Sequence, residues 1–244
     1  MIEIDATGLH YRELNERIHA AVAEGAESIR LINVRGQRYI GTGLRKPVYI
    51  EIHGVPGNDL AAFMEGPRIV VYGNAQDGCG NTMNAGEIIV HGHAGDITGL
   101  SMRGGKIFIR GNVGYRVAIH MKEYKDQRPI IVVGGTAQHF LGEYMAGGVL
   151  IVLGLDTPRG EHTARFIGTG MHGGVMYFRG TLKPEQLGKE VSVLEVDESD
   201  RALLRQLVGE FCHHFGYDLD EIMNGQFIKL LPLSKRPYGR LYAY

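Results

Sequence analysis

The sequence predicts a mainly β protein, a single-stranded right-handed parallel β-helix of about seven coils with α-helical caps at both ends. Three observations carry this prediction. Glycines close short apolar runs at a fixed spacing, isoleucine and valine columns recur with the same period, and a methionine column keeps step with both. A fixed repeat usually records a geometry, because each unit must bury its face against the next one.

Glycine is the compositional extreme, with 36 among 244 residues, about twice its ordinary share of roughly 7%. Closing glycines follow the apolar runs at Gly54, Gly73, Gly92, Gly111, Gly135, Gly154 and Gly180. The base spacing is 19 residues, with insertions around "KEYKDQR" and "DTPRGEHTAR". This period fits one coil of a parallel β-helix, because a strand must return to stack about 4.8 Å above its start.

The residues expected to shape the repeat are strand-flanking glycines and methionines that lie three positions before a strand-opening residue. They are Gly73, Gly86, Gly92, Gly105, Gly111, Gly148, Gly154, Gly174, Gly180, Met83, Met102, Met145 and Met171. Glycine permits backbone angles closed to other residues and lets the next coil approach closely. Methionine is unbranched and adaptable, so it is suited to fill the same corner in each coil.

Two apolar columns alternate along the strands and are expected to face the interior. They run Ile50, Ile69, Ile88, Ile107, Ile131, Leu150, Met176, and Ile52, Val71, Val90, Ile109, Val133, Val152, Phe178. Between them lies an outward column, Val70, Ile89, Phe108, Val132, Ile151 and Tyr177. An outward strand position is normally polar, so this stripe must be covered by the chain's own ends or by a partner. Both alternatives stay open.

The pattern divides the chain into an N-terminal helical cap at 1–28, the β-helix at 29–182, and a C-terminal helical cap with an extended arm at 183–244. "LHYRELNERIHAAVAEG" has apolar residues near helical spacing, so we expect a helix that closes the first coil. Apolar residues between 203 and 211 mark a second amphipathic helix, which Asp197 or Ser199 begins as its cap.

The final "FIKLLPLSKRPYGRLYAY" is basic, tyrosine-rich and interrupted by proline, which favours an extended arm. Tyrosine and arginine are enriched in interfaces, so Tyr238, Arg240 and Tyr242 of the arm join Phe108 of the outward stripe as candidate interface residues. A loosely ordered tail is the competing interpretation of the arm.

Composition excludes several classes of function. The formal net charge is −1, with 26 basic and 27 acidic residues, so no global field favours nucleic acid or an anionic membrane. Neither a signal peptide nor a run of about 18 apolar residues is found, and we expect a cytoplasmic protein. Cys79 and Cys212 are the only cysteines, which excludes a disulfide framework or an iron–sulfur site within this chain.

Two polar pairs are candidates for chemistry. His91 and His93 would point to the same face of a strand, as a metal site requires, but no third ligand lines up, and a polar corner ladder is the favoured interpretation. Asp77 and Asp96 lie at the 19-residue step in adjacent coils, where paired acids would suit a lyase or hydrolase acting on a sugar. No basic partner continues their column, so a solvated corner is favoured.

Three other features are weaker. His213 and His214 are adjacent in the expected C-terminal helix and should point in different directions. Cys79 could act as a nucleophile only with a nearby base, and its column neighbours predict a small half-buried position. The "GCG" and "GTG" stretches are not followed by Lys-Ser or Lys-Thr, which argues against a phosphate loop.

"GEYMAGGVLIVLG" followed by "IGTGMHGGVMYF" resembles the GXGXG domain, the C-terminal β-helix of the glutamate synthase large subunit. "NTMNAGEIIVHGHAGDITGLSMRGGKIFIRG" is also similar to the subunit of formylmethanofuran dehydrogenase that shares this domain. The resemblance spans about Ile29 to Gly180 and is specific for the fold, but less so for function. It implies a free-standing spacer without catalytic, cofactor-binding or metal-binding residues of its own.

The resemblance also implies partners: a class II glutamine amidotransferase subunit and an FMN- and iron–sulfur-containing synthase subunit, which would hold the cofactors that this chain lacks. Self-association into a homo-oligomer is compatible with the sequence. The favoured function is therefore a non-catalytic structural subunit of a glutamate synthase-like oxidoreductase complex. The alternatives are a component of formylmethanofuran dehydrogenase, equivalent to its GXGXG-domain subunit, and a β-helix enzyme that uses Asp77 and Asp96.

Overall fold

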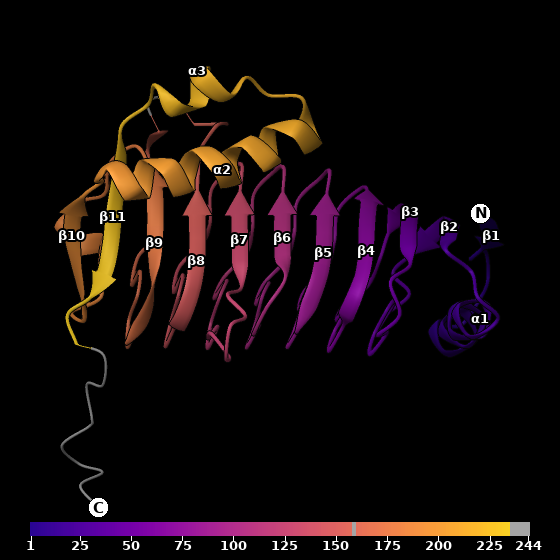
Figure 1. The fold of residues 1–244 in the computed structure, drawn as a ribbon. Helices are drawn as coiled ribbons and strands as arrows, with labels where there is room; N and C mark the ends of the chain where they lie inside the picture. The colour runs from indigo at the N-terminus through magenta and orange to yellow at the C-terminus, as the bar shows by residue number, and fades with distance from the viewer. Residues whose placement is uncertain (158–159, 235–244) are drawn as a thin grey trace, which may run out of the picture.

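The computed structural model describes residues 1–157 and 160–234 (Figure 1). Its strands are β1 (Ile2–Asp5), β2 (Ser28–Arg35), β3 (Tyr49–Val55), β4 (Glu65–Tyr72), β5 (Ala85–Val90), β6 (Lys106–Ile109), β7 (Ile130–Val133), β8 (Ala146–Val152), β9 (Gly173–Arg179), β10 (Val191–Glu195) and β11 (Phe227–Pro232). Its helices are α1 (Tyr11–Ala23), α2 (Glu198–Phe215) and α3 (Leu219–Met223), with a 3-10 turn at Pro184–Gln186. The predicted mainly β class is confirmed.

One sheet of 11 strands runs the length of the molecule, in the order β1 to β9 followed by β11 and β10. β1 to β9 pair in parallel, and the register aligns the repeats, since Ile50, Ile69 and Ile88 lie opposite one another. The two insertions do not disturb the interior columns: Ile107 pairs with Ile131, and Leu150 with Met176. The fold is a β-solenoid of about six turns, so the predicted count of seven coils is not confirmed.

Alternating backbone conformation defines the corner between coils. Three residues two positions apart have positive φ in every corner: Tyr39, Gly41, Gly43; Asp59, Ala61, Phe63; Gly78, Gly80, Thr82; Ile97, Gly99, Ser101; Arg116, Ala118, His120; Phe140, Gly142, Tyr144; Phe166, Gly168, Gly170. The middle residue is always glycine or alanine and always buried. A Cβ on Gly80 would overlap the Cδ1 of Ile107, and one on Gly99 would overlap that of Ile131. The "GCG" and "GTG" stretches therefore lie in corners.

The interior of the solenoid is an apolar core built by the repeat itself. Its methionine column is completely buried at Met64, Met83, Met102, Met121, Met145 and Met171. Met121 belongs to this column although the sequence analysis omitted it, because the first insertion follows it directly. The closing glycines lie against the preceding coil, and a Cβ on Gly73 would overlap the carbonyl oxygen of Gly54.

The N-terminal helix is present, and its Leu14 and Ile18 are fully buried in the interior core. His10 precedes it as the N-cap, and Glu24 is its C-cap. The sequence analysis missed β1, which pairs in parallel with β2 and places Ile4 opposite Leu31. The sheet therefore begins inside the segment predicted to be only a helical cap.

The second predicted helix is present as α2, but it lies along the sheet and not across its end (Figure 1). Three side chains of α2 contact three strands. Asp200 accepts a hydrogen bond from Tyr177 of β9, Glu210 accepts one from Lys106 of β6, and His214 lies beside Glu87 of β5. A helix rises about 1.5 Å per residue, so one turn of α2 passes approximately one strand of the sheet, at about 4.8 Å per strand. The same face of α2 thus meets successive strands.

The outward stripe is covered by this helix, which decides between the two alternatives left open above. Phe108 is fully buried and shares a core with the apolar side of α2, formed by Leu204, Leu207, Val208 and Phe211. The hypothesis that Phe108 is an exposed interface residue was wrong, because the chain's own helix occupies that face. Tyr238, Arg240 and Tyr242 lie outside the described residues.

The far end of the sheet is closed by an antiparallel pair. β11 returns beside β9, with Lys229 opposite Tyr177, and β10 pairs with the outer edge of β11. The C-terminal segment therefore extends the sheet as well as covering its outer face.

Candidate functional site

A cavity lies where β5 to β8 end, beside the turn that follows α2. It has a volume of about 330 Å³ and is lined by His91, Gly92, His93, Arg110, Gly111, Gly134, Gly135, Leu155, Asp156 and Tyr217. The solenoid supplies all of these residues except Tyr217, which comes from the C-terminal segment. The two histidines that the sequence singled out thus lie together in one cavity.

His93 belongs to a ladder of side chains that connects successive coils. Asn74 Oδ1 accepts a hydrogen bond from the His93 backbone N–H (2.8 Å), and His93 Nδ1 accepts one from the Asn112 backbone N–H (2.8 Å). Asn112 Oδ1 then accepts from the Thr136 N–H (2.7 Å). Because Nδ1 of His93 is an acceptor, the neutral ring carries its proton on Nε2.

His91 has a different environment, in a column of stacked aromatic rings. Its ring stacks on Tyr72 at a centroid distance of 4.9 Å, and Tyr72 stacks on His53 at the same distance. The ring of Phe215 at the end of α2 is nearly perpendicular to the His91 ring, with 5.2 Å between the two centroids. Burial, and then the positive charge of Arg110, lower the pKa of His91, so the ring is neutral near pH 7.

Arg110 supplies the positive charge of the cavity. Its guanidinium lies 6.0 Å from the centre of the Tyr217 ring, within the range of a cation–π interaction. Arg110 has no ion-pair partner in the described ranges 1–157 and 160–234. Neither Arg110 nor Tyr217 was identified as a site residue from the sequence, because Tyr217 lies outside the periodic pattern.

Asp77 and Asp96 form a second ladder. Asp77 Oδ1 accepts from the Asp96 backbone N–H (2.9 Å), and Asp96 Oδ1 accepts from the Tyr115 backbone N–H (2.8 Å). Both residues are exposed, and their carboxylates satisfy backbone donors of the next coil. This geometry gives them a role in coil stacking and supplies no paired acid and base.

The remaining candidates are divided between core and surface. Cys79 is fully buried, and burial raises the pKa of its thiol to about 12, which disfavours the nucleophilic thiolate. His213 is exposed, whereas the side chain of His214 faces the sheet and lies 3.5 Å from Glu87 Oε1. No group of three or more potential metal ligands occurs among the residues that the structure describes.

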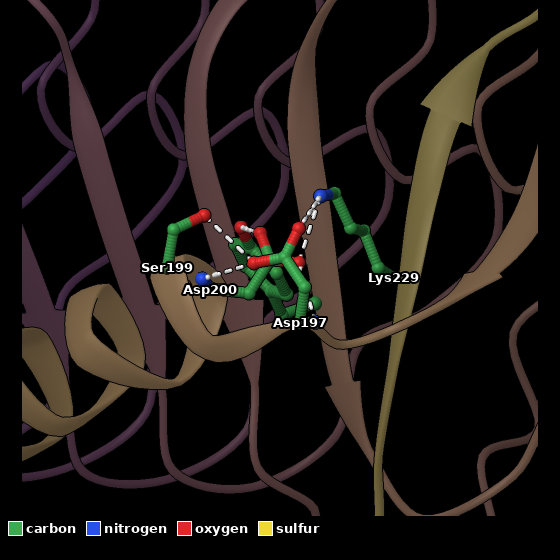
Figure 2. A network of polar contacts seen from close by, with 5 residues as sticks. Asp197, Ser199, Asp200 and Lys229 are labelled. Carbon is green, nitrogen blue, oxygen red and sulfur yellow. Dashed lines mark hydrogen bonds and ion pairs between the residues drawn. The ribbon is translucent and has the colours of Figure 1, made fainter.

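A buried polar network holds the beginning of α2 against the sheet (Figure 2). Tyr177 Oη donates to Asp200 Oδ1 (2.5 Å), and Lys229 Nζ donates to Asp200 Oδ2 (2.7 Å). Asp197 caps the helix by accepting from the Asp200 N–H, as predicted, and Ser199 also bonds to it. Sequence analysis missed Asp200 and Lys229, because partners 29 residues apart leave no periodic signal.

Two electrostatic effects compete at Asp200. Burial favours its neutral form, but the hydrogen bonds from Lys229 and Tyr177 outweigh burial and lower the pKa of this carboxyl. Burial, followed by the bond to Asp200, raises the pKa of the Tyr177 phenol. The network is therefore an anionic carboxylate held by a neutral phenol and a cationic amine, an arrangement that fixes α2.

Two comparisons with known proteins bear on the family of the chain. The family model described as the GXGXG motif matches residues 16–233. The chain is also 51% identical over 251 residues to "Uncharacterized protein MJ1350" of Methanocaldococcus jannaschii, a match that covers 99% of this chain and 96% of that protein. Among the described helices, none has the length and apolar character needed to cross a membrane.

Proposed function

We propose, from the premise that this chain belongs to the GXGXG motif family, that it is a non-catalytic scaffold subunit of a glutamate synthase-like complex. In this proposal it packs between a class II glutamine amidotransferase subunit and a synthase subunit that holds FMN and iron–sulfur clusters. Family membership supports the glutamate synthase setting, and the fold supports the scaffold role.

One observation carries the scaffold role: the polar side chains at the corners are used to connect coils. The ladders through His93 and through Asp77 and Asp96 satisfy backbone N–H groups of the next coil. These hydrogen bonds hold neighbouring coils together and make the solenoid rigid, which is the property that a spacer between two enzymes requires.

The surface available to partners differs from the one the sequence suggested. With the outward stripe under α2, the large apolar side chains left exposed on the described surface include a set at the corners: Tyr39, Phe63, Tyr144 and Phe166. Phe63 is 55% exposed and Phe166 50%. Aromatic residues dominate the energetics of many interfaces, so we assign partner contacts to this corner ridge.

Co-purification tests the proposal. The tagged chain, coexpressed with candidate amidotransferase and synthase subunits, is expected to retain both, and a Phe63→Asp, Phe166→Asp double variant is expected to lose at least one of them while remaining folded. The chain alone should show no glutamate synthase, glutaminase or lyase activity in steady-state assays.

Two results would favour one of the alternative functions over a glutamate synthase scaffold. Recovery of molybdopterin-containing subunits in place of the synthase would support the formylmethanofuran dehydrogenase setting. Lyase or hydrolase turnover that survives rigorous purification and disappears in Asp77→Asn or Asp96→Asn would establish a β-helix enzyme and overturn the scaffold role.

A further inference from the structure

We propose that the cavity between the ends of β5 to β8 and Tyr217 is a binding site for the carboxylate group of a small molecule, held by Arg110, His91 and His93. The site is distinct from the partner surface assigned above and does not depend on the scaffold role. Three observations carry the inference: the choice of residue at position 93, the environment of Arg110, and the charge balance of the cavity.

Position 93 carries a histidine where the ladder needs only an acceptor. Its neighbours in the same column are Asn74 and Asn112, and each uses its side-chain oxygen to accept a backbone N–H from the next coil. His93 performs the same task with Nδ1. Histidine therefore differs from asparagine in the place of its remaining donor: the Nε2–H lies across the ring from Nδ1, whereas the asparagine NH2 shares a carbon with the accepting oxygen, and His93 lines the cavity.

Arg110 contributes a positively charged guanidinium group to the same cavity as the His93 donor. The guanidinium group has no ion-pair partner in the described part of the chain, and the Tyr217 ring lies beside it. A planar guanidinium matches the two oxygens of a carboxylate, and such charge-assisted bonds are stronger than neutral ones. His91, neutral and packed between the Tyr72 and Phe215 rings, lines the same cavity.

The charge balance selects a monoanion. A metal ion is disfavoured because the Arg110 cation shares the cavity with the histidines and because Nδ1 of His93 is already used. Asp156 also lines the cavity, and its negative charge opposes a phosphate dianion more strongly than a carboxylate. At about 330 Å³ the cavity is at the small end of ligand sites, which fits a small organic acid.

Calorimetric and NMR titrations of the purified full-length chain test the site, with acetate and propionate as probes. The expected wild-type affinity is weak, on the order of millimolar, because the cavity is open and the probes are small. Binding should shift the imidazole nitrogen resonances of His93 and His91. Arg110→Gln should weaken propionate binding at least about tenfold, since a charge-assisted pair is lost.

His93→Asn is the sharper variant, because asparagine already fills this ladder position in the neighbouring coils. It should keep the melting temperature of the wild type while weakening propionate binding. His139→Asn is the matched control: His139 Nδ1 also accepts a backbone N–H, from Arg165, but His139 does not line this cavity. The His139→Asn variant should bind propionate with the affinity of the wild type.

Three outcomes would overturn the proposal. The first is no detectable propionate binding to the wild type at high millimolar concentration. The second is wild-type affinity in both folded variants, Arg110→Gln and His93→Asn. The third is tighter binding of inorganic phosphate than of either carboxylate near pH 8, which would assign the site to a phosphate group. The partner-subunit assay reports on the scaffold role separately, so failure of one proposal is distinguishable from failure of the other.

Discussion

The outward column of the sheet has two regions of opposite chemistry. At its N-terminal end the column is charged: Glu3, Arg30 and Glu51 lie opposite one another on β1, β2 and β3. From β4 onward the same column is apolar, running Val70, Ile89, Phe108, Val132, Ile151 and Tyr177. The next member, on β11, is again charged, because Lys229 lies opposite Tyr177.

The change in chemistry coincides with the reach of α2. Six apolar strand positions at about 4.8 Å cover roughly 24 to 29 Å, and an 18-residue helix at about 1.5 Å per residue is about 27 Å long. In the uncovered region Arg30 bonds to Glu51 (2.9 Å) and approaches Glu3 (4.0 Å). The column is thus apolar on the strands that α2 covers and charged on β1 to β3, which the helix does not reach, whereas the charge of Lys229 on β11 pairs with Asp200 at the beginning of the helix.

The largest expected effect comes from placing a charge under the helix. Phe108→Asp should destabilise the protein by more than about 5 kcal/mol, because the loss of a buried phenylalanine costs about 3–5 kcal/mol and the new carboxylate is buried without a partner. Urea denaturation followed by circular dichroism measures the loss. Since typical domains have only about 5–15 kcal/mol of stability, the variant is expected to be partly unfolded at 25 °C.

Phe63→Asp is the control for this prediction. Phe63 is 55% exposed at a corner with positive φ, a conformation that aspartate adopts more readily than phenylalanine. The change should therefore alter stability by no more than about 0.5 kcal/mol. If Phe108→Asp unfolds at the same urea concentration as Phe63→Asp, the helix does not cover the stripe in solution.

The boundary of the covered region should depend on the polar network at the start of α2. Asp200→Ala removes the partner of the Tyr177 hydroxyl and the nearer partner of Lys229, which keeps only Asp197 at 3.8 Å, and breaking a buried pair in this way costs about 3–5 kcal/mol. Hydrogen exchange should rise first in α2, because the helix loses its attachment to β9 and β11 while the interior core is untouched. Asp220→Ala, at an exposed pair with Arg205, should cost no more than about 1 kcal/mol.

The same network predicts a dependence on pH. The pKa of Asp200 is lower in the folded state than its unfolded value of about 3.9, so its contribution is fully present above that value. It is lost as the pH falls through the folded pKa, below about pH 4. Wild type should therefore lose more stability between pH 5 and pH 3 than Asp200→Asn, measured by urea titrations at each pH. An equal loss in both proteins would contradict the assignment.

The interior of the solenoid was predictable from the sequence because each coil specifies its own contacts. Ile88 and Val90 recur at 19-residue steps, and the sheet brings each beside its counterpart in the next coil. The corner glycines were predictable for the same reason, because they recur in successive coils and lie against the neighbouring coil. Helices α1 and α2 were also found from the spacing of their apolar residues, and Asp197, one of the two predicted caps, begins α2 through contacts only three residues away, whereas the short helix α3 was not predicted.

The position of α2 was not predictable in the same way, because it depends on contacts between distant segments. Lys106 bonds to Glu210 across 104 residues, and no periodicity links the two. Tyr217 reaches the cavity for the same reason, through the turn that follows α2. Glu3 and Arg30, the charged members of the outward column, indicate where the covered part of the sheet begins. Their strands β1 and β2 do not follow the 19-residue spacing, so the sequence pattern does not place them in this column.

Truncation of a side chain in the interior core should lower the free energy of unfolding by an intermediate amount. This loss should not depend on whether α2 covers the outer face of the same strand. Met102→Ala removes a fully buried side chain at a corner and should cost about 2 to 4 kcal/mol. The shift in the urea midpoint measures it, with Leu233→Ala, at a 65% exposed position, as the control. A midpoint equal to that of the wild type would show that the methionine column does not support the core.

The smallest effect is expected in the uncovered region of the outward column, and it sharpens the comparison most directly. Glu51→Gln keeps the size of the side chain but removes the charge that faces Arg30. Arg30 is exposed although Glu51 is only 14% exposed, so water and salt screen the pair, and the loss should be at most about 1 kcal/mol at low ionic strength. Raising the salt concentration should shrink the difference between variant and wild type, as measured by thermal melts. A large, salt-independent loss would mean that this end of the column is also covered in solution, and the two regions would then not differ in the way their chemistry indicates.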